Sequence, residues 1–381
     1  MYKKVALVFL ALSCVAFSQT REPKMQIALL LDTSGSMDGL IEQAKTRLWD
    51  LVNQMASARK GGADSVLEVA LYEYGKSTIP AEQHFLKQLV GLTTDLDKVS
   101  EALFALRTNG GDEFCGRVIH AATAELAWSP HTDDYKAVFI AGNEPFSQGD
   151  MPYATACSAA IARGIVVNTI FCGDEAEGIR TGWKDGATLA DGEFMVIDHN
   201  KQVKVAAAPQ DAKIIALSKE LNGTYLGYGK GGKQAETRQK TQDAAALAAA
   251  PSVAVQRAEA KTGKAYRTAS WDLVDAVAEG KVDLHTIEAE ALPEEMAEMD
   301  EAARKQYVAQ KADERRALKE EIAGLQKARK DYLKTVQPET EGTLDAAVAD
   351  VVRDQLKKRD FQLDVQPKKE TANPPEGAPK P

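Results

Sequence analysis

One short string of oxygen-bearing side chains has the types and the spacing that a divalent cation needs. Asp32, Ser34 and Ser36 alternate in the string Asp32-Thr33-Ser34-Gly35-Ser36. On a tight turn their oxygens can converge on one point, and Gly35 lets the backbone fold closely around that point. Carboxylate and hydroxyl oxygens suit a hard cation such as Mg²⁺. The alternative is that Ser34 or Ser36 only caps the helix that follows.

Alternating apolar and amphipathic segments around this string predict an α/β fold, a Rossmann-like and mostly parallel sheet with helices on both faces. The run 25–32 is almost continuously apolar, as expected of a strand buried on both sides. Ligands of such sheets bind beyond the carboxyl ends of the strands, where the string at 32–36 falls. The expected strands are 25–32, 66–74, 85–90, 137–141, 165–171 and 224–228, and the expected helices are 40–55, 96–106, 115–128, 153–163 and 212–221.

One long polar segment, 174–205, interrupts this alternation. It is rich in Gly and carries Asp191-Gly192 between two short alternating runs, which predicts an inserted β-hairpin. Because the segment follows a strand end, the hairpin should lie on the functional side of the sheet. Trp183, within it, either contacts a ligand or packs the insertion onto the domain.

The string LLLDTSGSM resembles the first metal loop of the von Willebrand factor A (VWA) family. The resemblance covers residues 25–228 and includes LSKELNGTYL, which is similar to the final helix and strand of that family. It implies a Rossmann-like sheet with a metal-ion-dependent adhesion site at its carboxyl edge. It also implies Mg²⁺, with Mn²⁺ or Ca²⁺ as substitutes, and a protein partner whose carboxylate completes the coordination. Asp32, Ser34 and Ser36 would then form the first metal loop.

The other two loops of the family pattern differ in this chain. Asp112 stands where the family has a Thr, with Thr108 four residues upstream. Gly142 stands where the family has an Asp. Our hypothesis is that Asp112 offsets the missing carboxylate, so that the site keeps its charge. The full set of expected metal ligands is Asp32, Ser34, Ser36, Asp112, Thr108 and Glu144, and the expected partner contacts are Glu113, Asn143 and Trp183. Glu113 and Glu144 can also act through water. The competing hypothesis is an empty, degenerate site whose loops bind the partner directly.

The first 18 residues have the pattern of a secretory signal. Lys3 and Lys4 precede the apolar run 5–12, and small residues precede position 19. This pattern predicts export to the periplasm or the extracellular space. A lipoprotein cleaved before Cys14 is a less favoured alternative, because Ala11 stands where a lipobox prefers Leu.

Three cysteines follow the leader, and export would permit a disulfide. Cys157 lies near the start of its predicted helix and Cys172 ends the next predicted strand, so both should lie near one edge of the sheet. A Cys157–Cys172 bridge is therefore geometrically possible. Cys115 sits on the same edge and is a rival partner.

The composition changes after residue 230, which predicts a VWA-like domain over 24–230 and a helical region over 235–361. The stretch 293–337 is highly charged and carries an apolar stripe at Leu318, Ile322, Leu325, Tyr332 and Val336. The stripe indicates either a helix packed within the chain or a coiled-coil dimer. Residues 362–381 hold five prolines and predict a disordered tail.

The overall charge narrows the functional classes. The chain has 47 basic and 56 acidic residues, a net charge of −9, which disfavours nucleic acid as a partner. The apolar run 5–12 of the leader is too short to span a bilayer, and no other apolar run is long enough to do so. No H-E-x-x-H or G-x-S-x-G motif is present. We therefore expect a secreted binding or scaffold protein rather than an enzyme. The alternatives are a metal-dependent hydrolase and a metal-free subunit of an envelope complex.

Overall fold

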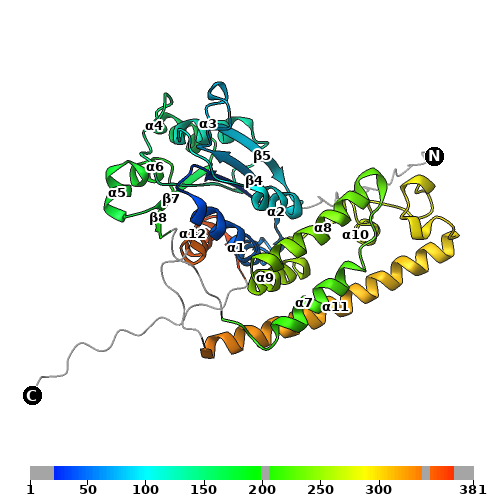
Figure 1. The fold of residues 1–381 in the computed structure, drawn as a ribbon. Helices are drawn as coiled ribbons and strands as arrows, with labels where there is room; N and C mark the ends of the chain where they lie inside the picture. Colours follow the sequence, from blue (N-terminus) through cyan, green and yellow to red (C-terminus); the bar gives the residue numbers. More distant parts are fainter. Residues whose placement is uncertain (1–20, 199–205, 337–343, 364–381) are drawn as a thin grey trace, which may run out of the picture.

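The computed structural model describes residues 21–198, 206–336 and 344–363. Figure 1 shows two parts. The sheet domain comprises 21–198 together with 344–363, and the helical arm comprises 206–336. The predicted leader, Cys14 and nearly all of the predicted disordered tail lie outside the described residues.

A six-stranded sheet forms the centre of the sheet domain, in the order β5-β4-β1-β6-β7-β8. All neighbouring strands are parallel except β5, which runs antiparallel to β4. The central strand β1 is flanked by β4 and β6 and is buried along most of its length. This order and these directions confirm the predicted fold class. The strands are β1 (Lys24–Asp32), β4 (Val66–Tyr74), β5 (Leu86–Thr93), β6 (Tyr135–Gly142), β7 (Val166–Cys172) and β8 (Phe194–Ile197).

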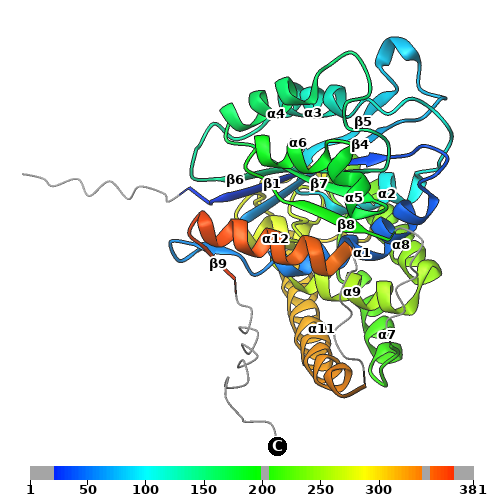
Figure 2. The ribbon, with the colours of Figure 1, turned by 90° about the vertical axis from the view of Figure 1, so that its left-hand side faces the viewer.

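Alternate residues of each strand face opposite layers of helices, because side chains in a strand point to the two faces in turn. In β1, Ile27 and Leu31 join one apolar core, and Ala28 and Leu30 join the other. The first core lies under α1 (Asp38–Met55), α2 (Leu96–Ala105) and α12 (Leu344–Lys358). The second lies under α3 (Cys115–Glu125), α4 (Tyr153–Ala162) and α6 (Trp183–Leu189). Figure 2 shows these two layers above and below the sheet.

The predicted hairpin at 174–205 is wrong for the part that the structure describes. Two short helices, α5 (Glu175–Arg180) and α6, are followed by β8, which pairs in parallel with β7. Asp191-Gly192 is not a hairpin turn. Asp191 has a left-handed φ of 53° just after α6, and a side chain at Gly192 would collide with the backbone of Val167. The pair therefore ends a helix and brings the chain close against β7.

The segment predicted to end the sheet, 212–228, belongs instead to the helical arm. α7 (Asp211–Asn222) packs on α9 (Pro251–Thr262) and α11 (Glu301–Val336). The predicted strand at 224–228 makes only an isolated bridge, between Gly227 and Asp272. Tyr225 stacks on Trp271 within the core of the arm. The alternation of apolar residues in this segment therefore serves helix packing.

The helical arm also contains α8 (Gly229–Ala249), α10 (Leu273–Ala278) and the long α11. The glycines at 229, 231 and 232 are part of the first turn of α8. Leu318, Ile322 and Leu325 of the apolar stripe pack inside the arm, as the first of the two alternatives predicts. Short 3₁₀ turns lie at Ala81–Gln83, Ala289–Ala291 and Glu294–Met296, and a small second sheet joins β2 (Arg59–Lys60), β3 (Ala63–Asp64) and β9 (Phe361–Gln362).

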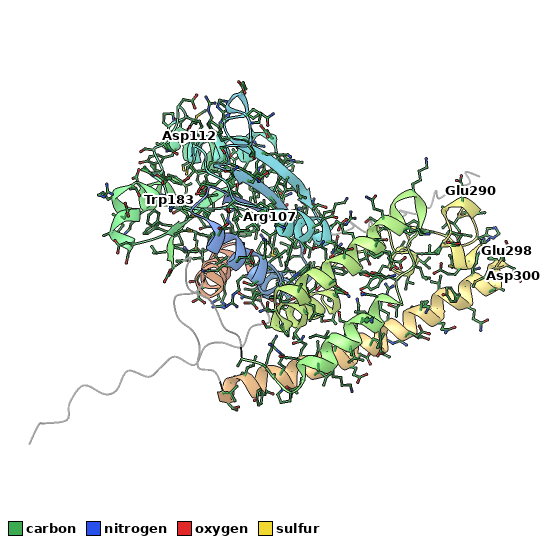
Figure 3. All side chains as sticks on the ribbon, in the orientation of Figure 1. Arg107, Asp112, Trp183, Glu290, Glu298 and Asp300 are labelled. Carbon is green, nitrogen blue, oxygen red and sulfur yellow. The ribbon has the colours of Figure 1, made fainter. Side chains whose placement is uncertain are left out.

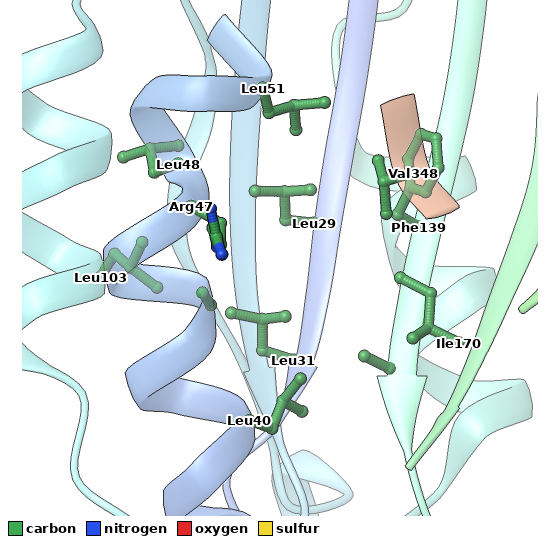
Figure 4. A pocket seen from close by; sticks show the side chains of 12 residues that line it. Leu29, Leu31, Leu40, Arg47, Leu48, Leu51, Leu103, Phe139, Ile170 and Val348 are labelled. Carbon is green, nitrogen blue, oxygen red and sulfur yellow. The ribbon is translucent and has the colours of Figure 1, made fainter. Parts of the chain in front are cut away.

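Helix α12 returns from the arm to the sheet domain and covers its lower face beside α1. Val352, Leu356 and Phe361 join the first core. Between α12, α1 and the sheet lies an apolar cavity of about 60 Å³, which Val348 helps to enclose (Figure 4). None of the described helices combines the length and the apolar character that a membrane crossing requires.

The three described cysteines are free thiols and are buried. The expected Cys157–Cys172 bridge is therefore not formed. Cys157, on α4, belongs to the core on one face of the sheet, whereas the side chain of Cys172 points into the core on the other face. The sheet itself therefore separates the two sulfur atoms. The sequence predicted only that both cysteines lie near one edge of the sheet, not that they lie on opposite faces.

Candidate functional site

The predicted first loop lies directly at the carboxyl end of β1, between the two neighbouring central strands. Asp32 is fully buried, Ser34 nearly so, and Ser36 is exposed. The backbone N–H of Ser34 donates to Oδ1 of Asp32 at 2.7 Å, and the two serine hydroxyl oxygens are 3.2 Å apart. The loop therefore does bring these three side chains to one place.

Glu113 supplies the second carboxyl group of the site. It precedes α3, is only 5% exposed, and shares a side-chain hydrogen bond with Asp32. Burial, followed by the charge of Asp32, raises the pKa of Glu113 to about 9. Burial raises the pKa of Asp32 to about 6, against the hydrogen bond from the Ser34 backbone. At neutral pH Glu113 is therefore the proton donor of the pair and Asp32 is the anion.

Glycine at position 75 makes this carboxyl pair possible. Gly75 follows β4 with φ of +80°, and a Cβ built there would lie 2.7 Å from Cγ of Glu113 and 2.8 Å from Oδ1 of Asp32. Any larger residue would therefore displace one of the two acids. The sequence predicted Glu113 as a partner contact or as a residue that acts on the metal through water. It did not indicate the contact of Glu113 with Gly75, because that contact joins loops that are distant in sequence.

Asp112 does not take the role that the sequence hypothesis gave it. Asp112 is exposed, whereas the side chain of its neighbour Glu113 points inward and contacts Asp32. Thr108 donates its hydroxyl hydrogen bond to Asp38 at the start of α1. The second loop thus reaches the site through Glu113. A one-residue shift of this kind depends on backbone direction, which the sequence pattern does not contain.

The third loop follows β6 and brings Asn143 to the exposed side of the site. Ser36 Oγ donates to the Asn143 side-chain oxygen at 3.4 Å. The charge of Glu144 lies close enough to oppose ionisation of both Asp32 and Glu113. Asn143 and Glu144 are both half-buried, so this loop forms part of the accessible rim.

Gly142, in place of the family's Asp, sits in a tight slot. A Cβ there would lie 2.6 Å from the Tyr74 hydroxyl, 3.1 Å from Oδ2 of Asp32 and 3.1 Å from the Trp183 ring. Tyr74 is held in this position by its hydrogen bond to the carbonyl of Ala141 at 2.9 Å. The packing around the site therefore leaves no room for an aspartate at position 142.

Trp183 is a packing residue, and the expectation that it touches a partner is wrong in this structure. Its side chain is 0% exposed and packs against Phe146 and Phe171. Its indole N–H donates to the carbonyl of Glu144 at 2.8 Å. Trp183 thereby fixes the third loop from below. Figure 3 places it within the sheet domain.

The donors of this site are compatible with a hard cation. Oδ2 of Asp32 is buried and has no hydrogen-bond partner among the described residues. Ser34, Ser36 and Asn143 add neutral oxygens, which Mg²⁺ accepts alongside water. Within the described ranges, no group of three or more His, Cys, Asp or Glu side chains is arranged for a metal. Any cation would therefore be held by one carboxylate and several neutral oxygens.

Comparisons with known proteins add little to this description. No family model matches the chain, and no curated protein sequence does so either. Solved structures that share part of the fold include proximal thread matrix protein 1 from the mussel byssus (16% identity, 47% of this chain, 43% of that chain, TM-score 0.36). A second is the conserved hypothetical protein BatB from Bacteroides thetaiotaomicron (16% identity, 46% and 90%, TM-score 0.35). A third is the SpRpn10 VWA domain (14% identity, 47% and 90%, TM-score 0.36).

Similarity at this level supports no argument about function, and this chain spans less than half the length of the mussel protein. The fold assignment rests on the sheet itself. The strand order places β1 at the centre, the antiparallel strand lies at one edge, and the Asp32 loop follows the central strand. These features agree with the resemblance carried by LLLDTSGSM. The sheet domain of this chain has the fold of a von Willebrand factor A domain.

Proposed function

We propose that this protein is a binding module that engages a protein partner at the carboxyl edge of its sheet, through a divalent cation. The observation that carries the proposal is the buried Oδ2 of Asp32, which lacks a hydrogen bond among the described residues; the same loop brings the hydroxyl oxygens of Ser34 and Ser36 within 3.2 Å of each other. Asp32, Ser34, Ser36 and Asn143 would hold the cation. The resemblance to the VWA family supports a carboxylate of the partner as a further ligand.

The chemistry of such a site is electrostatic attraction. A bound cation supplies positive charge to which an acidic side chain of a partner can bind. The protein orients the loop oxygens, and Glu113 holds a proton next to Asp32, so that the pair carries a single negative charge. That low charge predicts weak binding, with a Kd on the order of 0.1–1 mM.

Calorimetric titration with MgCl₂ and with MnCl₂ tests the proposal on the full chain. We expect saturable heat from the wild type and its loss in Asp32→Asn, which preserves side-chain size. Glu298→Gln is the matched control, since it makes the same change of charge at the far end of the arm (Figure 3). Circular dichroism verifies that both variants fold. If the wild type gives no heat with Mg²⁺ and none with Mn²⁺, the proposal that a divalent cation binds is overturned.

A metal-free binding site is the second candidate, and the Asp32–Glu113 hydrogen bond favours it. The proton on Glu113 already stabilises the buried carboxylate. In that case the exposed loop residues Ser36, Asn143 and Glu144 would contact the partner directly. Magnesium would then change neither the thermal stability of the protein nor its partner binding. The hydrolase alternative stays a prediction that no observation here tests.

Export to the periplasm or the extracellular space is also part of the proposal. Its support is the leader pattern of residues 1–18, which lie outside the described residues. Cell fractionation of the full chain and of a variant with Lys3 and Lys4 replaced by Glu tests it. Retention of the wild type inside the cell would contradict export.

A further inference from the structure

Three helices of the arm form a groove that the proposed function does not use. α7 and α8 both pack on α9, which lies between them in Figures 1 and 2. The space between α7 and α8, above α9, has a volume of about 680 Å³. It belongs to the arm, apart from the carboxyl edge of the sheet. The groove therefore represents a separate surface.

Small apolar side chains line the walls of this groove. Ala212 and Ala216 of α7 face Ala244 of α8, and Ala254 of α9 contributes to the floor. Alanine walls let another helix approach closely, near the lower limit of about 8 Å between helix axes. Leu247 also lines the groove and is 45% exposed, one of the few large apolar side chains so exposed among the described residues. Alanine walls beside an exposed leucine are suited to larger apolar side chains from outside.

One end of the groove is closed by hydrogen bonds. Nδ2 of Asn222 on α7 donates to Oδ2 of Asp243 on α8 at 2.7 Å. The same carboxylate receives Arg257 at 2.5 Å and Lys261 at 2.8 Å. Asp243 is therefore fully paired and has no need of a ligand cation. The helices are fixed at this end and open toward Ala212 and Leu247.

The charge of the lining is opposite to that of the chain. Lys219 and Lys240 bring two positive charges to the lining, whereas its one carboxylate, Asp243, is paired with Arg257 and Lys261, in a chain of net charge −9. Lys219 and Lys240 are exposed and stand on opposite walls. Among the described residues, Lys240 pairs with Glu236 of its own helix alone, at 2.5 Å, and exposed pairs of this kind are weak. Acidic side chains on both flanks of a guest would complement these lysines.

We propose that this groove binds an amphipathic helix of a partner protein, with an apolar stripe at i, i+3 or i+4 and i+7 and acidic residues on both sides of the stripe. The lining residues on this wall run from Ala212 of α7 to Gly223, directly after the helix. At 1.5 Å per residue they span about 16 Å, the length of three helical turns. A docked guest would pack beside α7, α8 and α9 as a fourth helix and cover Leu247.

The test uses a synthetic 18-residue helical peptide with leucines at i, i+3 and i+7 and glutamates on both flanks. A matched peptide carries lysines in place of the glutamates. Fluorescence anisotropy with the full chain should give micromolar affinity for the acidic peptide, at least tenfold tighter than for the basic one. Ala216→Arg should weaken this binding at least tenfold. Ala317→Arg, an exposed alanine of α11, is the matched control and should leave it unchanged.

A reversal of charge makes the test independent of folding. The double variant Lys219→Glu/Lys240→Glu should prefer the basic peptide over the acidic one. Equal affinity of the two peptides for the wild type, or binding that Ala216→Arg does not alter, would overturn the proposal. So would sedimentation showing a dimer that Ala216→Arg dissociates, because a second copy would then occupy the groove. Asp32→Asn should not change peptide binding, which separates this inference from the proposed function.

Discussion

Glu113 determines the charge state of the candidate site. It lies inside, against Asp32, in the space that Gly75 leaves free. The sequence predicted that Asp32, Ser34 and Ser36 converge, because their spacing on one turn decides it, and the structure brings the three side chains together. The sequence did not indicate that Glu113 rather than Asp112 points inward. That choice depends on how the loop before α3 meets the loop after β4, a long-range contact that spacing along the chain does not encode.

The raised pKa of Glu113 predicts a pH-dependent effect of Glu113→Gln. A carboxyl whose pKa rises from 4.5 to about 9 on folding contributes stability below pH 4.5 and loses it as the pH rises toward 9. Glutamine cannot ionise, so the free energy of unfolding of the variant should rise relative to that of the wild type as the pH increases from 5 to 8. We expect a gain of about 4 kcal/mol over these three pH units, at about 1.4 kcal/mol per unit.

Urea unfolding in the presence of EDTA measures this gain at both pH values. Glu82→Gln, an exposed acid of the loop after β4, is the control and should show no such trend. If Glu113→Gln and the wild type lose stability equally with rising pH, Glu113 is not the protonated member of the pair.

At the scale of elements, the sequence predicted best where one period of apolar residues decided the structure. The strand at 66–74 has the predicted bounds, since its apolar residues fill a buried central position. The predictions were wrong where apolar residues pack against a different element from the one expected. Tyr225 and Leu226 alternate like a strand, yet they pack in the two cores of the arm. Helix α12 was expected only as part of a helical region, and its return to the sheet had no local signal.

Gln355 is the polar anchor of α12 on the sheet. Its amide exchanges hydrogen bonds with the Asn168 amide at 2.7 and 3.2 Å and accepts from the Tyr135 hydroxyl at 2.7 Å. Gln355→Ala leaves these buried groups unpaired and should cost about 2–3 kcal/mol. Asp354→Ala, at the exposed neighbouring position, should cost far less.

Urea unfolding gives the cost, and limited proteolysis reports whether α12 is released. We expect faster cleavage near α12 in Gln355→Ala alone. Equal stability and equal cleavage of the two variants would mean that apolar packing alone holds the helix.

At the scale of the whole molecule, Arg257 joins the arm to the sheet domain. It is 1% exposed, pairs with Asp97 of α2 at 2.7 Å, and lies over the ring of Trp49 in α1 at 4.6 Å. Asp243 of α8 pairs with it from the other side. Because α1 and α2 flank the loops of the candidate site, the arm holds the elements that position those loops.

Arg257→Met should destabilise the protein by about 3–5 kcal/mol, because it leaves the buried Asp97 without its cation and removes one of the two cations that pair with Asp243. Arg316→Met, which removes an exposed arginine of α11, should change stability little. Urea unfolding followed by circular dichroism and by tryptophan fluorescence measures both. Separate unfolding of the arm and the sheet domain in the wild type would contradict their close coupling.

The position of α12 also has a consequence for how the chain is made. The ribosome completes all strands of the central sheet by Ile197, yet Leu344, the first residue of the covering helix, emerges only after the whole arm. Until then, the apolar side chains that α12 covers are exposed to solvent. The nascent polypeptide therefore finishes its first-made domain last, and its exposed face depends on protection from aggregation throughout translation.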